Sequence, residues 1–142
     1  MGKLKISGLG CTLLDFVYNG IDFKGPGFQK YISRNVGDGG LTPGQLVFLE
    51  ELEKFAGKKF EEIHAEIAGD RKLDASNIGG QAIVSIIHAA QMLQDKAEKR
   101  FVGSMGEASI AEKNLDSLLI TSAKSTKLVK KDARTAFTNI LL

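Results

Sequence analysis

The sequence predicts an α/β fold in which helices pack on a sheet. Segments with the alternating or continuous apolar pattern of strands take turns with segments that have the apolar spacing of a helix. The chain has 142 residues, of which 43% are hydrophobic and 25% charged, so it can bury the core of one domain or of part of one. It contains no internal repeat and no low-complexity segment.

The first part of the chain is predicted to contain strands joined by turns. Its apolar residues alternate with polar ones or follow one another, and glycines interrupt them. The Asn19-Gly20 pair is a strong hairpin signal between two strand-like runs. The predicted elements are a strand over 3–9 that ends in a turn at Gly8 and Gly10, a strand over 12–18, a strand over 28–36 and a glycine-rich loop over 37–44.

The middle of the chain is predicted to form helices. Thr42 can cap a helix, Pro43 suits its first position, and Gln45 completes a capping-box pattern. The apolar side chains that follow have helical spacing, and Gly57 suits the end of the helix. A helix over 80–94 is apolar on most sides, so we expect it to be buried between other elements. The other predicted elements are a short helix over 58–69, a strand over 99–106, a helix over 108–119 and two strands around a turn at Lys131-Asp132.

The composition excludes several classes of protein. The formal net charge of +2 is too small to indicate binding to nucleic acid or to an anionic membrane. No apolar run approaches the length of a transmembrane helix, and the N-terminal residues lack the apolar region of a signal peptide. The single cysteine, Cys11, excludes a disulfide framework and fits a reducing compartment, so we expect the protein in the cytoplasm.

The potential metal ligands do not form a recognisable motif. The only histidines, His64 and His88, stand far apart from each other and from Cys11, so no metal cluster has the proper spacing. His88 stands among isoleucines and alanines, which predicts an imidazole buried in the core.

Two features are candidates for a ligand site. Asp15 is an acid inside an apolar run, and a buried carboxylate is costly unless it is paired or bound to a ligand. Gly79 and Gly80 open the predicted helix over 80–94, where bare N–H groups point outward and no side chain blocks a ligand. Both features also have a structural interpretation. Asp15 could face water on an edge strand, and the glycines could permit close packing of the helix against a strand.

Three segments, in this order and spacing, resemble the N-terminal half of the PfkB family, the ribokinase-like carbohydrate and nucleoside kinases. They are ISGLGCTLLD at 6–15, NIGGQAIVSIIHAAQML at 77–93 and FVGSMGEASIAEKNLDSLL at 101–119. The resemblance implies a central, mostly parallel sheet flanked by helices and a small β lid from roughly 16–24 and 28–36. It also implies a fold that is incomplete at the C-terminus, in keeping with a chain that ends in an apolar strand.

The resemblance assigns substrate binding to five residues. The acid that matches Asp15 hydrogen-bonds substrate hydroxyls, and the glycines that match Gly79 and Gly80 let the substrate lie against the backbone. Val84 and Cys11 stand at two positions where members of the family have an asparagine, so this chain departs from the family's pattern there.

Further departures concern the third segment and the phosphotransfer motif. Ala108 replaces the second acid of the family's Gly-Asp-Asp, Glu107 stands at the first, and Ala111 replaces a glycine. Because a lost buried polar contact costs about 1–3 kcal/mol, we expect an unusual substrate or weak sugar binding. The family's Asp-Thr-x-Gly-Ala-Gly-Asp run, which supplies the base and an anion hole, is absent from the sequence. The resemblance therefore implies that the catalytic residues and the site for ATP and Mg²⁺ lie outside this chain.

The function implied is the substrate-binding half of an ATP-dependent kinase that phosphorylates a hydroxyl of a sugar or a nucleoside, inactive when alone. The expected partners are this small molecule and either a second copy, through the lid, or a C-terminal half. One alternative is a non-catalytic sugar-binding or interaction protein of the same fold, which Val84, Cys11 and Ala108 favour. Another is a plain α/β interaction domain, in which Asp15 and the glycines are structural.

Overall fold

The computed structural model describes residues 3–106, 125–131 and 135–142. The helix predicted over 108–119 and part of the turn at Lys131-Asp132 lie outside these residues. By its contacts the chain divides into two compact units, which we call the sheet unit and the helical unit. The sheet unit comprises Met1–Val17 and Ala75–Ile140, and the helical unit comprises Tyr18–Asp74 and Leu141–Leu142.

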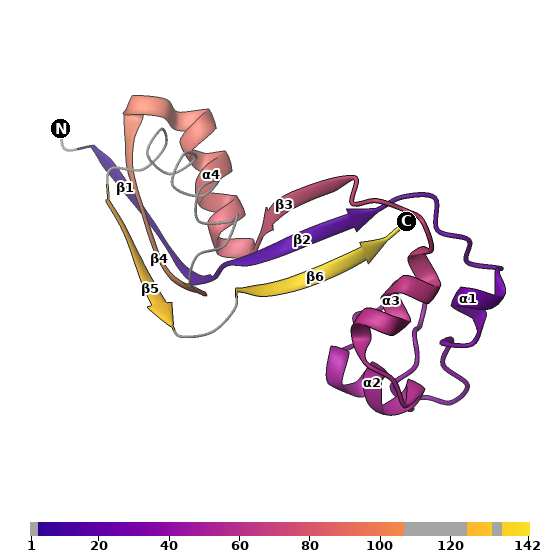
Figure 1. Ribbon diagram of the computed structural model, residues 1–142. Helices are drawn as coiled ribbons and strands as arrows, with labels where there is room; N and C mark the ends of the chain where they lie inside the picture. Colours follow the sequence, from indigo (N-terminus) through magenta and orange to yellow (C-terminus); the bar gives the residue numbers. More distant parts are fainter. Residues whose placement is uncertain (1–2, 107–124, 132–134) are drawn as a thin grey trace. The chain divides into compact units, whose positions relative to one another are not determined.

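The sheet unit contains a three-stranded parallel sheet with the strand order β1-β4-β5. Its strands are β1 (Leu4–Cys11), β4 (Ala97–Gly106) and β5 (Ser125–Lys131). Helix α4 (Gln81–Leu93) lies along β1 and β4, as Figure 1 shows, and a 3-10 turn over Gln94–Lys96 connects it to β4. The predicted α/β arrangement of a helix on a parallel sheet is therefore confirmed.

The core of the sheet unit is built around α4. Its buried members are Leu14, Ile83, Ile86, Ile87 and Phe101. Gly8 and Gly10 lie inside β1, so the turn predicted there is wrong. Their lack of a side chain lets α4 approach the strand. A Cβ atom at Gly8 would lie 2.6 Å from Cγ1 of Ile86, and one at Gly10 would lie 2.9 Å from Cβ of Ala82.

Helix α4 agrees with its predicted range but not with its predicted burial. Ile83, Ile86, Ile87 and Ala90 are buried and share one side of the helix. His88 is exposed, and the exposed fraction of Met92 is 83%. The prediction of a core imidazole at His88 is wrong, because this residue lies off the buried stripe in spite of its apolar neighbours in sequence.

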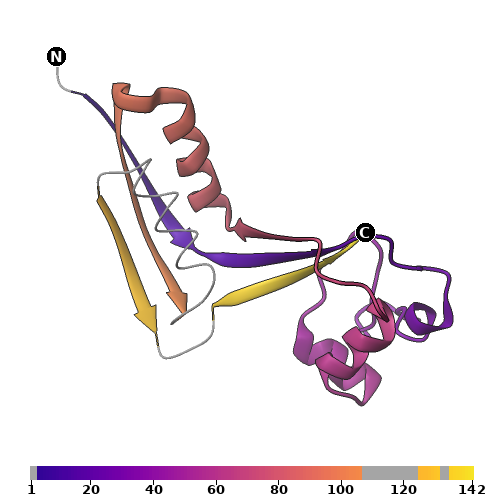
Figure 2. The same ribbon diagram turned by 45° about the horizontal axis from the view of Figure 1, so that its top comes forward.

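A second three-stranded sheet has the order β3-β2-β6. Its strands are β2 (Leu13–Tyr18), β3 (Ala75–Gly79) and β6 (Ala136–Leu141). Figure 2 shows β2 continuing the chain directly after β1, with the yellow strand β6 beside it. The rings of Phe16 and Phe137 face each other at a centroid distance of 6.0 Å. The strand predicted over 12–18 is confirmed, but its partners come from distant parts of the sequence.

The helical unit contains no strand of its own between Asn19 and Asp74. Its helices are α1 (Pro26–Gln29), α2 (Leu49–Ala56) and α3 (Phe60–Ala68). The hairpin predicted at Asn19-Gly20 and the strand predicted over 28–36 are therefore wrong. Phe28 and Tyr31 are buried three residues apart, and Pro26 starts α1, so this segment turns back on itself where the alternation predicted an extended chain.

The other predictions for this unit hold in part. Helix α2 begins at Leu49 without a side-chain cap, so the predicted capping box at Thr42 is wrong. It ends at Gly57, whose φ of 66° is left-handed, as predicted, and α3 confirms the short helix over 58–69. Two buried clusters hold the unit together, Ile21, Phe28 and Ala68 in one and Tyr31, Leu52 and Ile63 in the other. Among the helices described, none has both the length and the apolar character needed to cross a bilayer.

Candidate functional site

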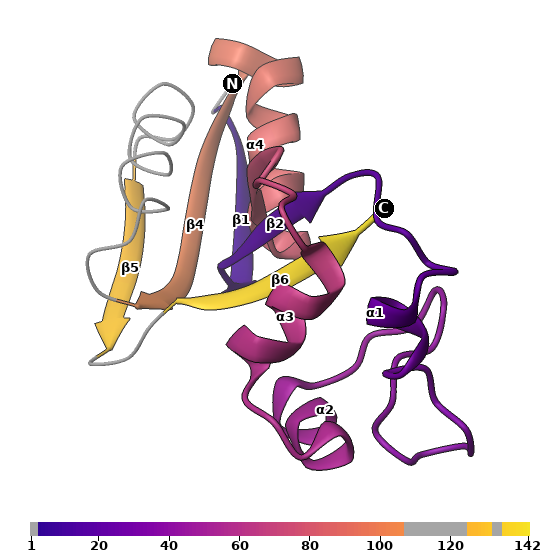
Figure 3. The same cartoon turned by 45° about the vertical axis from the view of Figure 1, so that its right-hand side comes forward.

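Figure 3 shows the end of β1 beside the start of α4, and several of the predicted site residues belong to these two ends. Cys11 is the last residue of β1 and is paired with Ser104 of β4. Gly80 caps α4 with a φ of 108°, and a Cβ atom there would lie 2.4 Å from the carbonyl oxygen of Cys11. Ligands of open parallel sheets bind outside the carboxyl ends of the strands. This edge of the sheet is therefore the candidate site.

Asp15 lies directly beside the first glycine of the pair. In the antiparallel register of β2 and β3, Leu13 is opposite Gly79 and Asp15 is opposite Asn77. A Cβ atom at Gly79 would lie 2.5 Å from Oδ2 of Asp15 and 2.3 Å from Cδ1 of Leu13. A larger residue at this position would have to displace the ends of these two side chains, and the structure brings the predicted acid and the predicted glycine together.

The Asp15 carboxylate has no hydrogen bond or ion pair with any residue that the structure describes, and the side chain is half-buried. A half-buried carboxylate without a protein partner can accept hydrogen bonds from water or from a ligand. The structural interpretation of the glycine pair is confirmed in part. A Cβ atom at Gly80 would meet the end of β1, as expected for close packing of the helix against a strand, whereas one at Gly79 would meet side chains of β2. This packing occupies the Cβ side of the glycines. It does not involve the N–H groups of the first turn of α4.

A residue that the sequence interpretation missed lies in the same place. Thr12 connects β1 to β2 and is 2% exposed, and its Oγ1 has no hydrogen-bond partner among the described residues. Its backbone N–H donates to the carbonyl oxygen of Ser104, at 3.2 Å. A buried hydroxyl without a partner is rare in native proteins. The one feature of the sequence that could have pointed to Thr12 is its position three residues before Asp15.

The remaining predicted residues have different surroundings. The side chain of Cys11 is exposed at the end of β1. Val84 is half-buried and packs against the apolar cluster around α4. Glu107, Ala108 and Ala111 lie outside the described residues.

No group of three or more His, Cys, Asp and Glu side chains could hold a metal ion within the described ranges. His64, in the helical unit, lies between aromatic rings instead. Its ring centroid is 4.6 Å from that of Tyr18 and 5.6 Å from that of Phe60. Burial lowers the pKa of His64, and its Nε2 atom is buried without a hydrogen-bond partner among the described residues.

Comparison with known proteins gives structural relatives only. No family model matches the chain, and no curated protein matches it. Among solved structures, adenosine kinase from Schistosoma mansoni in complex with 2-fluoroadenosine matches with a TM-score of 0.67 at 20% identity. Adenosine kinase from Anopheles gambiae matches with a TM-score of 0.63 at 18% identity, and ribokinase from Giardia lamblia with 0.55 at 18%. The chain has a ribokinase-like fold.

The match spans this chain but not those proteins. For the kinase from Schistosoma mansoni it covers 100% of this chain and 36% of the kinase. The corresponding shares are 96% and 35% for the kinase from Anopheles gambiae, and 99% and 30% for the ribokinase from Giardia lamblia. The chain thus spans about a third of the length of the ribokinase-like proteins it matches. At this level of identity the likeness concerns the fold, and the fold expected from the resemblance to PfkB kinases is confirmed.

Proposed function

We propose that this chain supplies the acceptor-binding part of an ATP-dependent kinase that phosphorylates a hydroxyl of a sugar or a nucleoside. The observation that carries the proposal is the contact between Asp15 and Gly79 at the carboxyl edge of a ribokinase-like sheet. It joins an acceptor for hydroxyl protons to the start of α4, where Gly79 is buried and Gly80 is half-buried. The hydroxyls of a polyhydroxylated ligand can donate to the carboxylate, and its oxygens can accept from the free N–H groups of the first turn of α4.

Three further observations support the same site. The unpartnered hydroxyl of Thr12 adds a buried polar group at the junction of β1 and β2. The first turn of α4, behind Gly80, has outward-facing N–H groups. The sheet β3-β2-β6 carries Asp15, and we take it as the lid in place of the strands predicted over 16–24 and 28–36.

The proposal gives these residues a role in binding only. The described residues contain no cluster that could hold Mg²⁺, so we assign them no step of phosphoryl transfer. ATP, Mg²⁺ and the catalytic base belong, in this proposal, to a part of the kinase outside this chain, either a C-terminal half or a partner subunit. A second copy that pairs through the lid is a further proposed partner, and the cytoplasm is the proposed compartment, in keeping with the single Cys11.

A non-catalytic sugar-binding or interaction protein of the same fold is the second candidate. Val84 favours it, because this residue packs in the apolar cluster where the kinase family has a polar contact to the substrate. Cys11 favours it for the same reason, since a thiol is a weaker hydrogen-bonding group than an amide.

Titration of the 142-residue chain with adenosine, ribose and fructose by calorimetry tests the site. We expect at least one of them to bind, and Asp15→Asn to weaken that binding by about 10- to 150-fold, because hydrogen bonds to a charged acceptor contribute about 1.5–3 kcal/mol. Asp70→Asn is the matched control, since Asp70 is an exposed acid outside the site. Absence of binding, or equal affinities for the two variants, would overturn the proposed site.

A second measurement separates the two candidate functions. The longest product of the gene is incubated with ATP and the ligand that binds, and phosphorylated product is followed by ³¹P NMR. Formation of a sugar or nucleoside phosphate supports the kinase. Binding without product supports the non-catalytic protein.

A further inference from the structure

A pocket of about 260 Å³ lies in the helical unit, between the segment that follows α1 and the end of α2. We call it the basic pocket, and it is lined by Lys30, Tyr31, Arg34, Phe55, Ala56 and Lys58. Three of these six side chains are cations and none is an acid. The volume is slightly below the range of about 300–1,000 Å³ typical of sites for drug-sized ligands, so a smaller molecule fits it.

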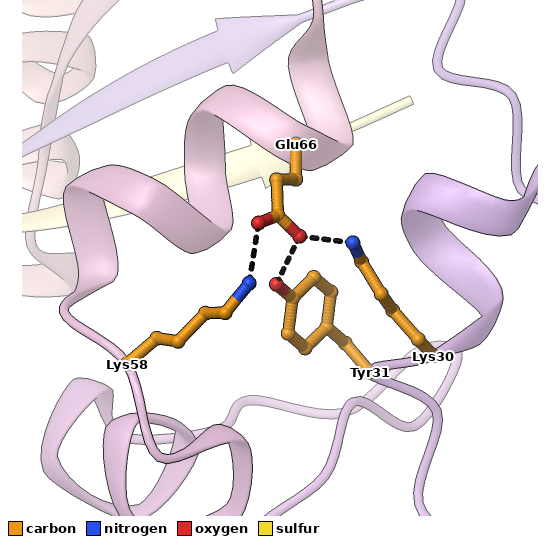
Figure 4. Close-up of polar contacts among 4 residues, drawn as sticks. All are labelled: Lys30, Tyr31, Lys58 and Glu66. Atoms are coloured by element: carbon orange, nitrogen blue, oxygen red, sulfur yellow. Dashed lines mark hydrogen bonds and ion pairs between the residues drawn. The ribbon is translucent and has the colours of Figure 1, made fainter.

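Glu66 of α3 fixes two of the cations at the pocket, as Figure 4 shows. Its Oε1 accepts a hydrogen bond from Nζ of Lys58 at 2.5 Å, and its Oε2 forms an ion pair with Lys30. Oε2 also accepts a hydrogen bond from the hydroxyl of the buried Tyr31, at 2.5 Å. Each ammonium has three N–H donors, so both lysines keep donors for another acceptor while Glu66 holds them in position.

The third cation has no such partner. The guanidinium of Arg34 makes no ion pair or hydrogen bond with any residue in the described part of the chain. The nearby carboxylate of Asp38 is occupied by backbone, since it accepts hydrogen bonds from the N–H groups of Arg34, Asn35 and Gly40, at 2.7, 2.8 and 2.9 Å. These bonds hold the turn that carries Arg34 and leave its side chain available.

The charges around the pocket do not balance. Two of the three cations, Lys30 and Lys58, share the carboxylate of Glu66, and Glu62 adds only a weaker attraction to Lys58 from outside the lining. An anion that enters would meet three cations and no acid among the side chains of the lining. A planar guanidinium binds phosphate and carboxylate groups through two parallel hydrogen bonds, and ammonium groups act on them as point charges.

The pocket also has an apolar wall. Phe55 and Ala56 belong to α2 and are half-buried, and the ring of Tyr31 is almost wholly buried behind them. A bare inorganic ion would leave this wall unused, whereas a ring or a short chain would cover it and remove apolar surface from water.

We propose that the basic pocket binds a small organic anion, in which one phosphate or carboxylate group is carried by an apolar ring or short chain. Arg34 receives the anionic group together with Lys30 and Lys58, and Phe55 and Ala56 contact the apolar part. The inference goes beyond the proposed kinase function, because every residue it uses lies in the helical unit and none belongs to the site at Asp15.

Phenyl phosphate is a suitable probe, with inorganic phosphate and phenol as its two halves. Added to the ¹⁵N-labelled 142-residue chain, phenyl phosphate should shift the amide signals of residues 30–34 and 55–58 with a Kd at or below about 1 mM. Inorganic phosphate and phenol should each bind more weakly. Arg34→Gln should weaken the binding of phenyl phosphate by about 3- to 10-fold, as expected for an exposed charge that makes paired hydrogen bonds.

Lys72→Gln is the matched control, because Lys72 is an exposed cation of the same unit outside the pocket lining. Arg34 is exposed, so its variant should fold, and the unchanged remainder of the amide spectrum checks this. Three results would overturn the proposal. They are the absence of saturable shifts with phenyl phosphate, an equal effect of Arg34→Gln and Lys72→Gln, and binding of inorganic phosphate as tight as that of phenyl phosphate.

Discussion

Replacement of Gly79 by Ala should displace the side chains of Leu13 and Asp15 on the neighbouring strand β2. The new Cβ atom would lie 2.3 Å from Cδ1 of Leu13 and 2.5 Å from Oδ2 of Asp15, and both distances are far below a normal contact. Overpacking of this kind costs about 1–3 kcal/mol. The φ of Gly79 is not left-handed, so alanine also restricts the unfolded chain and recovers about 0.4–1 kcal/mol. The free energy of unfolding should therefore fall by between about 0 and 2.6 kcal/mol.

Urea denaturation followed by circular dichroism measures this loss, and a double-mutant cycle identifies its cause. Gly79→Ala should cost less in a Leu13→Ala background, by at least about 0.5 kcal/mol, since the closest clash is then gone. Gly57→Ala is the control, because a Cβ atom there meets nothing within 4 Å and its cost comes from a φ of 66°. Its cost should be the same with and without Leu13→Ala. Additive costs of Gly79→Ala and Leu13→Ala would refute the packing that we describe at the site.

Three further predictions concern the helical unit. Glu66→Gln should reduce stability at pH 7 but have little effect near pH 2. Hydrogen bonds from its neighbours, Lys30 first, lower the pKa of Glu66 from 4.5 to about 2. The contribution of Glu66 to the free energy of unfolding is therefore complete above pH 4.5 and is lost as the pH falls toward 2. If urea denaturation gives a stability difference between wild type and variant that does not change with pH, this assignment is contradicted. Burial lowers the pKa of His64, so the folded state disfavours its protonation and the wild type should lose stability as the pH falls below 6.5. His64→Phe should not show this loss. A pH profile of thermal unfolding that is the same for both proteins would speak against this prediction. Ile63→Ala should lower the free energy of unfolding in urea by about 2–5 kcal/mol, since Ile63 is 0% exposed. Leu46 is 72% exposed, so Leu46→Ala should change it by no more than about 0.5 kcal/mol. A cost below about 1 kcal/mol for Ile63→Ala would refute the assigned core.

The elements that the sequence predicted well are those whose residues determine them locally. Helix α4 has the helical spacing of its isoleucines, and α2 ends at Gly57 because glycine takes the left-handed conformation there. The hairpin signal at Asn19-Gly20 failed because β2 pairs with β3 and β6, which are distant in sequence. Pairing between distant strands is decided by tertiary contacts, and the alternation over 28–36 could not reveal that Phe28 and Tyr31 are both buried, in two clusters of a helical unit.

The residue types of the candidate site could be predicted from the sequence better than the burial of its residues. Asp15 and Gly79 were found because an acid in an apolar run and a glycine before an apolar helix are unusual in themselves. Thr12 is unremarkable in sequence, and its buried hydroxyl is seen only in the fold, where it lies between β1 and β2 with its backbone N–H bonded to Ser104 of β4. The opposite error occurred at His88, whose apolar neighbours in sequence suggested burial although it points away from the buried stripe of α4.

The site depends on the register of β2 and β3, and this register is held beyond the ends of the two strands. A shift by one residue would turn Asp15 to the opposite face of the sheet and away from Gly79. The long segment between the strands could permit such a shift, but its two ends are joined, because the backbone N–H of Asn19 donates to Oδ2 of Asp74 at 2.7 Å. That bond shortens the loop that the pairing has to close. The geometry of the proposed acceptor site therefore depends on the pairing of β2 with β3, and the contact between Asn19 and Asp74 contributes to this pairing from outside the site.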